Sequence, residues 1–132
     1  MRQLMKPVNM KATRIFDALI TRCDEEGGYI KVDNSNGTYM PLSVEKVGPD
    51  KYSFAHYYEQ GGDLMADPEI VLWKNDKDGR LYPTYFKQAP YFDHELVVFE
   101  GNEPVRYARA AQRDCATFCG TWATNIKDQQ RL

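Results

Sequence analysis

One stretch of 22 residues decides the fold that this sequence predicts: Tyr52-Ser-Phe-Ala-His-Tyr-Tyr-Glu-Gln-Gly-Gly-Asp-Leu-Met-Ala-Asp-Pro-Glu-Ile-Val-Leu-Trp73. Its first half alternates, and residues 61–63 supply the positive φ that a chain reversal needs. Asp67-Pro68 favours extended backbone, and the apolar run up to Trp73 is typical of a strand buried on both faces. The stretch therefore predicts an antiparallel hairpin. The alternation puts Tyr52, Phe54, His56 and Tyr58 on one strand face and Ser53, Ala55, Tyr57 and Glu59 on the other.

Four further strands and two helices are expected on either side of this hairpin. The strands are predicted at residues 29–32, 40–47, 81–88 and 94–100, each followed by turn-forming residues. Asn9 is a good cap for a first helix, which should end before Gly27. Residues 101–104 break the pattern before a long C-terminal helix. That helix carries an apolar stripe of Tyr107, Ala111, Cys115, Phe118, Trp122 and Ile126.

These elements predict an α+β fold. We expect an antiparallel meander of about six strands, with the N-terminal helix and the long C-terminal helix packed on one face. Residues 1–132 should form a single domain, because a chain of this length can bury a sufficient core. On the C-terminal helix, Trp122 should face the sheet, Gln112 should face outward, and Gly120 should allow close approach to the sheet.

The aromatic residues suggest that the sheet has a second apolar face. Eleven of the seventeen aromatic residues lie between Tyr52 and Phe99, yet one layer of helices covers one face only. Either a loop, a partner subunit or a ligand covers the second face, or the sheet curls and buries both sets. The second face is expected to carry Tyr57, Trp73, Tyr82 and Phe86, and the first face Tyr52, Phe54 and Tyr85.

The three cysteines are expected to be reduced thiols in the core. Cys115 and Cys119 lie four residues apart on the predicted helix, where side chains rarely bridge, and Cys23 is distant in sequence. We find no targeting signal and no apolar run of the roughly 18 residues that a membrane span needs. The sequence therefore predicts a cytoplasmic protein without membrane contact and without a cofactor.

The charge changes along the chain. Residues 32–104 carry thirteen acidic and six basic side chains, whereas both ends are mildly basic. Arg106, Arg109 and Arg113 fall on one side of the first turns of the predicted C-terminal helix, where the helix dipole disfavours cations. They either pair with the acidic sheet edge or form an anion grip with free helix N–H groups. The acidic residues among the aromatic ones disfavour a nucleic-acid platform on the sheet.

A candidate chemical site surrounds His56. A histidine and carboxylates that meet at a hairpin end could bind a divalent ion or act as acid and base. The alternative is structural, because a histidine between two aromatic residues is typically a hydrogen-bonded core residue and turns favour Asp. The chain has no Walker loop, dinucleotide fingerprint, nucleophile elbow or zinc-protease motif, so a non-catalytic role is favoured over an enzyme. The site residues proposed here are His56, Tyr58, Asp63, Asp67 and Glu69.

Part of the chain resembles a known group of proteins. The run His56-Tyr-Tyr, then Gly-Asp and Asp-Pro-Glu69, followed by Gly79-Arg-Leu-Tyr-Pro83, is similar to a family of small uncharacterised bacterial proteins encoded on conjugative elements, plasmids and phages. The resemblance covers about residues 52–100. It implies a cytoplasmic accessory protein of a mobile element, in a setting where small proteins often bind host or defence components. It implies no catalytic residues.

Three functional hypotheses follow. The leading one is a non-catalytic module that binds a protein partner. The second is a small metal-dependent enzyme that uses His56, Asp63, Asp67 and Glu69, and the third is nucleic-acid binding through Arg106, Arg109 and Arg113. Whether the chain forms a homo-oligomer is left open.

Overall fold

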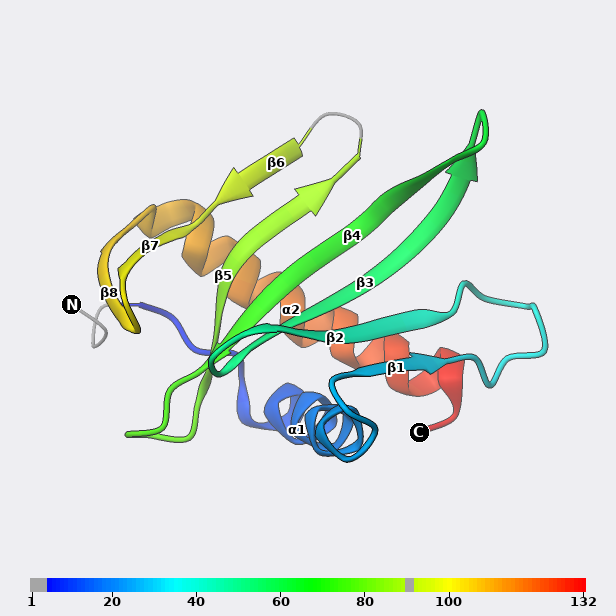
Figure 1. Ribbon diagram of the computed structural model, residues 1–132, viewed down its shortest axis with the longest axis horizontal. Helices are drawn as coiled ribbons and strands as arrows, with labels where there is room; N and C mark the ends of the chain where they lie inside the picture. The colour runs from blue at the N-terminus through cyan, green and yellow to red at the C-terminus, as the bar shows by residue number, and fades with distance from the viewer. Residues whose placement is uncertain (1–4, 90–91) are drawn as a thin grey trace.

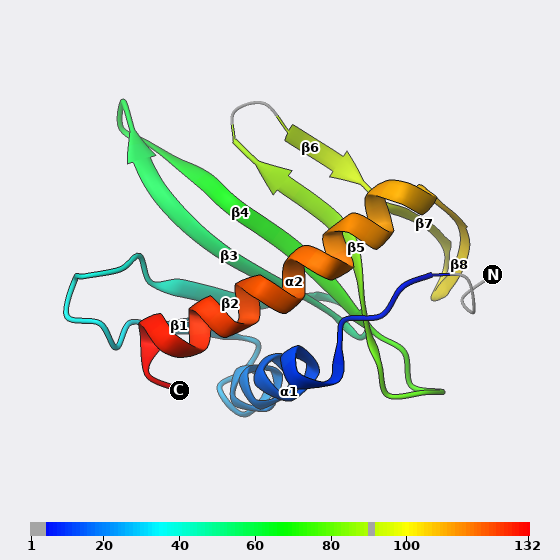
Figure 2. The same cartoon turned by 180° about the vertical axis from the view of Figure 1, so that it is seen from behind.

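The computed structural model describes residues 5–89 and 92–132, and it has the α+β architecture expected from the sequence (Figure 1). The elements in chain order are α1 (Met10–Glu25), β1 (Tyr29–Val32), β2 (Leu42–Gly48), β3 (Lys51–Gln60), β4 (Asp63–Lys74), β5 (Leu81–Gln88), β6 (Phe92–Glu95), β7 (Val97–Glu100), β8 (Glu103–Tyr107) and α2 (Arg109–Gln130). Strands β1 to β6 form one antiparallel meander in sequence order, and β7 pairs with β8 alone. Both helices lie on the same side of the sheet (Figure 2).

Helix α1 begins where the sequence predicts it. The Asn9 side chain caps the helix, because its Oδ1 accepts a hydrogen bond from the backbone N–H of Ala12 at 2.8 Å. The helix ends at Glu25, and the two glycines that follow have positive φ values of 84° and 107°. Such values suit glycine, so this turn can lead directly into β1. The inner face of α1 buries Phe16, Leu19 and Cys23.

The β3–β4 hairpin is longer than predicted. Residues 63–68 continue strand β4 instead of forming part of the turn, and Asp63 pairs with Gln60 at the tip. The ladder shifts register along its length, because Ala55 pairs with Glu69 whereas Tyr57 pairs with Ala66. This bulge increases the local bend of the hairpin beside His56.

A second bulge changes which side chains of β5 point to each face of the sheet. Val71 pairs with Tyr85 and Leu72 with Pro83, which leaves Thr84 without a ladder partner. One unpaired residue reverses the alternation beyond it. Phe86 therefore turns toward α2 and contacts Phe118, with ring centroids 6.1 Å apart, while Tyr85 turns to the other face. The face assignment predicted for Tyr85 and Phe86 is wrong for this reason.

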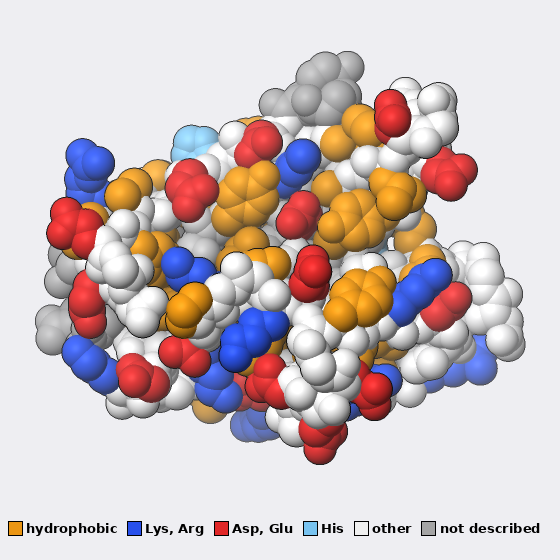
Figure 3. All heavy atoms as spheres, in the orientation of Figure 1, with side chains coloured by type: hydrophobic (Ala, Val, Ile, Leu, Met, Phe, Trp, Pro, Cys, Tyr) orange, Lys and Arg blue, Asp and Glu red, His pale blue; other side chains and the backbone are white. Residues whose placement is uncertain are grey.

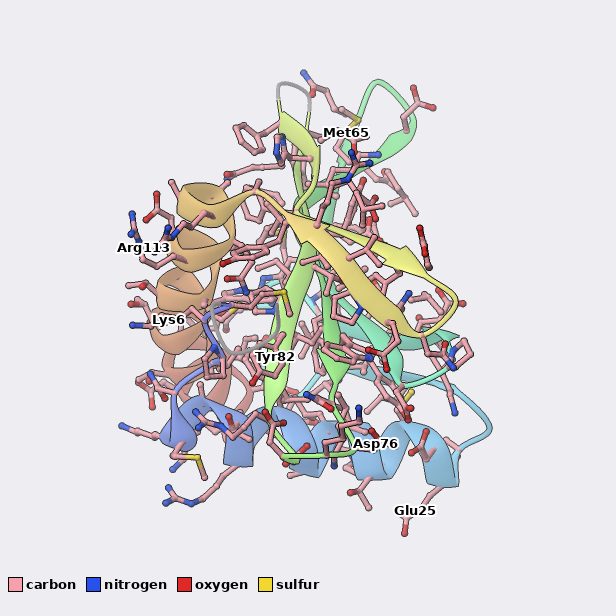
Figure 4. All side chains as sticks on the ribbon, turned by 90° about the vertical axis from the view of Figure 1, so that its left-hand side faces the viewer. Lys6, Glu25, Met65, Asp76, Tyr82 and Arg113 are labelled. Atoms are coloured by element: carbon pink, nitrogen blue, oxygen red, sulfur yellow. The ribbon has the colours of Figure 1, made fainter. Side chains whose placement is uncertain are left out.

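The predicted strand at residues 94–100 is two strands in the structure. Strand β6 belongs to the meander, whereas β7 leaves it and forms a small hairpin with β8, a strand that the sequence did not predict. Figure 4 shows this hairpin on the side of the sheet opposite α2. Its Phe99 packs edge-on against Trp73 at 5.4 Å, and Trp73 lies 5.8 Å from Tyr82. The hairpin therefore covers the Trp73 end of the second sheet face.

Helix α2 begins at Arg109, later than the apolar stripe suggests. Trp122 faces the core as predicted, and its ring contacts Phe16, His56 and Phe118. The three cysteines are free and buried, which confirms their prediction as reduced core thiols. Neither described helix has the length and apolarity that a membrane crossing requires.

Two expectations about α2 are wrong. Gln112 is fully buried rather than outward, because its Oε1 accepts from the Lys6 N–H at 2.8 Å and its Nε2 donates to the Lys6 carbonyl at 2.9 Å. A hydrogen-bonding side chain anchors the N-terminal segment here, although its position alone suggests a solvated residue. Gly120 faces Asn9 instead of the sheet: a Cβ at position 120 would lie 2.5 Å from the Asn9 amide nitrogen. The glycine therefore allows α2 to approach the start of α1.

Candidate functional site

His56 is a core residue on the α2 side of the sheet. Only 6% of it is exposed, and its ring stands perpendicular to Trp122 with centroids 5.5 Å apart. Within the described residues its Nε2 has no hydrogen-bond partner. Burial lowers the pKa of His56, and the negative charge of Asp67 partly opposes this shift. The structure thus places a neutral imidazole in an aromatic environment.

The residues expected around His56 do not converge. Glu69 pairs with Ala55 on the opposite face of the sheet, where it accepts a hydrogen bond from Ser53 Oγ at 3.1 Å. Asp63 lies at the tip of the hairpin, and Asp67 accepts from Gln88 Nε2 at 2.9 Å. Across residues 5–89 and 92–132, no group of three His, Cys, Asp or Glu side chains is placed to hold a metal ion.

Tyr58 is also separate from a common site. It is half-buried and pairs with Met65 on β4, between His56 and the exposed hairpin tip. No element brings it together with the arginines of the C-terminal region. The five candidates from the hairpin are therefore spread along it and over both of its faces.

The three arginines do not form the expected arrangement either. Arg106 lies on β8 rather than on the helix, and Arg109 is the first residue of α2. Arg113 Nε lies 3.9 Å from Asp114 Oδ1 of the same helix, and both side chains are well exposed. In the described part of the chain, none of the three is within ion-pair distance of a sheet carboxylate. The predicted pairing with the acidic sheet edge is wrong.

The feature that the sequence only partly indicated is an uncovered sheet face, which we call the open face. It lies opposite the helices and beyond the β7–β8 hairpin, and in Figure 3 hydrophobic and acidic side chains lie side by side across it. Strand register assigns its members. They form two rows across the strands, Tyr29, Glu45, Ser53, Val71, Tyr85 and Glu95, and beside them Lys31, Ser43, Ala55, Glu69, Lys87 and Asp93. Tyr57, which pairs with Ala66, follows Ala55 on the same face.

Tyrosines and carboxylates are in contact on the open face. The Tyr85 hydroxyl donates to Asp93 Oδ1 at 2.7 Å, and burial together with this bond raises the pKa of Tyr85. Burial also raises the pKa of Tyr57, and the nearby charges of Glu69 and Glu45 add to the shift. Both phenols are therefore neutral at physiological pH and keep their O–H groups as hydrogen-bond donors.

Sequence reasoning found the tyrosines of this face only in part. Alternation placed Tyr57 on the second face, but the bulge at Thr84 hid the fact that Tyr85 joins it. Sequence reasoning did not identify Tyr29 and Glu45 as neighbours on this face. They lie in the two predicted strands before the hairpin, and pairing these strands in register would have placed them opposite each other.

Comparison with known proteins gives one informative result. No curated protein and no solved structure matches the chain significantly. One family model matches residues 11–132, a range that includes both helices, the sheet and the small hairpin. The chain therefore belongs to the family described as a domain of unknown function, DUF6908.

Proposed function

We propose that this chain is a non-catalytic accessory protein of a phage, plasmid or conjugative element that acts in the cytoplasm by binding a protein partner through the open face. The resemblance of residues 56–69 to proteins of mobile elements supports the biological setting. The observation that supports binding is the open face itself, a sheet surface with tyrosines and carboxylates that no described element of the chain covers.

The tyrosines of the open face suit protein recognition. Tyr29 is half exposed, and Tyr57 and Tyr85 are partly exposed. Tyrosine offers a rigid apolar ring and a polar end at low entropic cost, so it is enriched in protein interfaces. The buried Ser53 and Ala55 lie between these larger side chains and leave the rings as the prominent features of the surface.

The charges of the open face define the partner's chemistry. The two rows carry four carboxylates, those of Glu45, Glu69, Asp93 and Glu95, against two ammonium groups, those of Lys31 and Lys87. A partner surface rich in Lys and Arg would complement this pattern, and complementarity of charge speeds association and favours the correct partner. A nucleic acid would meet repulsion here, because its phosphates have the same sign as the carboxylates.

The open face is also large enough for a protein interface. Six strands about 4.8 Å apart span about 24 Å across the sheet. A typical protein interface buries about 800 Å² on each partner. A surface of this width, with side chains such as Tyr29 on the edge strand β1 and Glu95 on the edge strand β6, can supply most of that area.

Site-specific photocrosslinking in living bacteria tests the proposal. A photoreactive phenylalanine analogue replaces Tyr29, which is 50% exposed on the open face, or Tyr39, which is 47% exposed in the loop between β1 and β2. We expect a defined protein adduct from position 29 and little from position 39. Identification of the adduct should show a basic surface on the partner. Equal crosslinking at both positions, or adducts to nucleic acid alone, would contradict the proposal.

Charge reversal gives an independent check with a matched control. The double variant Glu45→Lys/Glu95→Lys changes two exposed carboxylates of the open face, while Glu25→Lys/Asp128→Lys changes two exposed carboxylates on the helices by the same total charge. Binding of a Lys/Arg-rich peptide should weaken with salt and be lost in the first variant only. The same loss in both variants would show that net charge, not the open face, controls binding.

A further inference from the structure

A cleft lies on the helix side of the sheet, away from the open face. It lies between β5, β6 and the N-terminal half of α2, and its volume is about 310 Å³. Its walls are almost entirely apolar. The apolar lining comes from Phe86 and Phe92 of the sheet, Leu96 after β6, and Ala111, Cys115 and Phe118 of α2.

The aromatic walls of the cleft are partly open to solvent. Phe86 contacts Phe92 and Phe118, with ring centroids 5.5 and 6.1 Å away. Phe92 is 48% exposed and Phe118 is 41% exposed, although Phe118 belongs to the apolar stripe of α2. Three rings around one hollow leave apolar area that a guest ring can cover with edge and face contacts.

Among the described residues, the polar ones that line the cleft are Asp114 and Gln88, and both offer hydrogen-bond acceptors. The Asp114 carboxylate is exposed, and the Arg113 Nε lies 3.9 Å from its Oδ1. Gln88 donates one N–H of its Nε2 to Asp67 at 2.9 Å, so its carbonyl oxygen and its second N–H remain for a guest. Acceptors and a negative charge beside an apolar hollow select a guest that carries donors and a positive charge.

We propose that this cleft binds a small aromatic amine, with the ring among the three phenylalanines and the ammonium group at Asp114. The size agrees with this guest, because an apolar cavity of about 150 Å³ holds benzene and a cavity twice as large leaves room for a short side chain. A cation near the face of Phe92 or Phe118 gains additional attraction from the ring. The site is on the opposite side of the sheet from the open face, so it does not depend on the proposed function.

Calorimetric titration with two probes that share a phenethyl group but differ in charge tests the proposal. Phenethylamine carries a positive ammonium group and 3-phenylpropionate a negative carboxylate, each joined to the ring through two methylene groups. The full-length protein should bind phenethylamine at millimolar concentration and bind 3-phenylpropionate at least about tenfold more weakly, a difference of about 1.4 kcal/mol. Equal binding of the two probes, or no binding of phenethylamine, would overturn the proposal.

Two pairs of variants locate the binding. Ala111→Phe fills the cleft and should abolish binding, while Ala110→Phe changes an exposed neighbour and should not. Asp114→Asn should remove the preference for the cation, while Asp128→Asn, at another exposed position of α2, should keep it. Circular dichroism verifies that each variant is folded. Retention of the charge preference in Asp114→Asn would contradict the assigned role of this carboxylate.

The thiol of Cys115 provides a readout that needs no mutation. It is 7% exposed and lines the cleft, whereas Cys23 and Cys119 are fully buried. The hydrogen bond with Cys115, together with burial, raises the pKa of Cys119, which disfavours its reactive thiolate. Phenethylamine should therefore slow alkylation of Cys115 by iodoacetamide, measured by mass spectrometry of the intact protein and its peptides. Unchanged alkylation at saturating amine would place the ligand elsewhere.

Discussion

Replacing Trp122 by alanine should strongly destabilise the protein. Trp122 is 5% exposed and lies where α1, α2 and the sheet meet, with ring centroids of Phe16, His56 and Phe118 at 6.2, 5.5 and 6.2 Å. The substitution removes the central ring from this cluster. The substitution leaves a cavity between the two helices and the sheet, and its cost depends on how far these elements can collapse into it.

The magnitude follows from the burial. Truncation of a buried Trp costs about 3–5 kcal/mol, compared with about 5–15 kcal/mol for the whole free energy of unfolding. For a domain of 132 residues, each kcal/mol lowers the melting temperature by about 3–5 °C. Trp122→Ala should therefore lower the Tm by more than about 10 °C or unfold the protein.

Urea denaturation followed by circular dichroism measures this difference. The matched control is Asn125→Ala, which removes an exposed side chain one turn further along the same helix and should change the free energy of unfolding by less than about 0.5 kcal/mol. A loss below about 1 kcal/mol for Trp122→Ala, or equal losses in both variants, would refute the packing described here. In that case the apolar stripe of α2 would be a surface and not part of the core.

Three further predictions concern residues that the structure reassigned. Gln112→Ala should lower the free energy of unfolding by about 1–3 kcal/mol, because it leaves the Lys6 N–H and carbonyl without their partner, while Arg113→Ala on the exposed side should have little effect in the same urea titration. The pKa of His56 is lowered in the folded state, so the unfolded chain binds a proton on this imidazole at a higher pH than the folded chain does. The free energy of unfolding should therefore fall as the pH drops below about 6.5. Its slope against pH should be shallower in His56→Phe, and identical slopes in the two proteins would contradict the burial of a neutral His56. Addition of Zn²⁺ or Mn²⁺ should leave the Tm unchanged, since His56 and Glu69 lie on opposite faces of the sheet, and a rise that His56→Phe abolishes would disprove this geometry.

Local sequence signals were sufficient for much of the fold. The Asn9 cap, the glycine turns and the alternation of residues 52–59 each depend on neighbouring residues only, so α1, the β3–β4 hairpin and the meander order could be predicted from them. The apolar stripe of α2 likewise identified Trp122 as a core residue. The existence and order of these elements, which depend on the backbone preference and the period of each segment, were confirmed.

The tertiary structure decided which faces those residues occupy and which of them meet. A bulge such as that at Thr84 reverses every later side chain, and it depends on the partner strand rather than on the local pattern. The β7–β8 hairpin and the burial of Gln112 depend on contacts between segments distant in sequence. For the same reason the cluster around His56, which is close in sequence, is divided between two faces of the sheet. Proximity along a strand does not give proximity of side chains, because successive residues point in opposite directions.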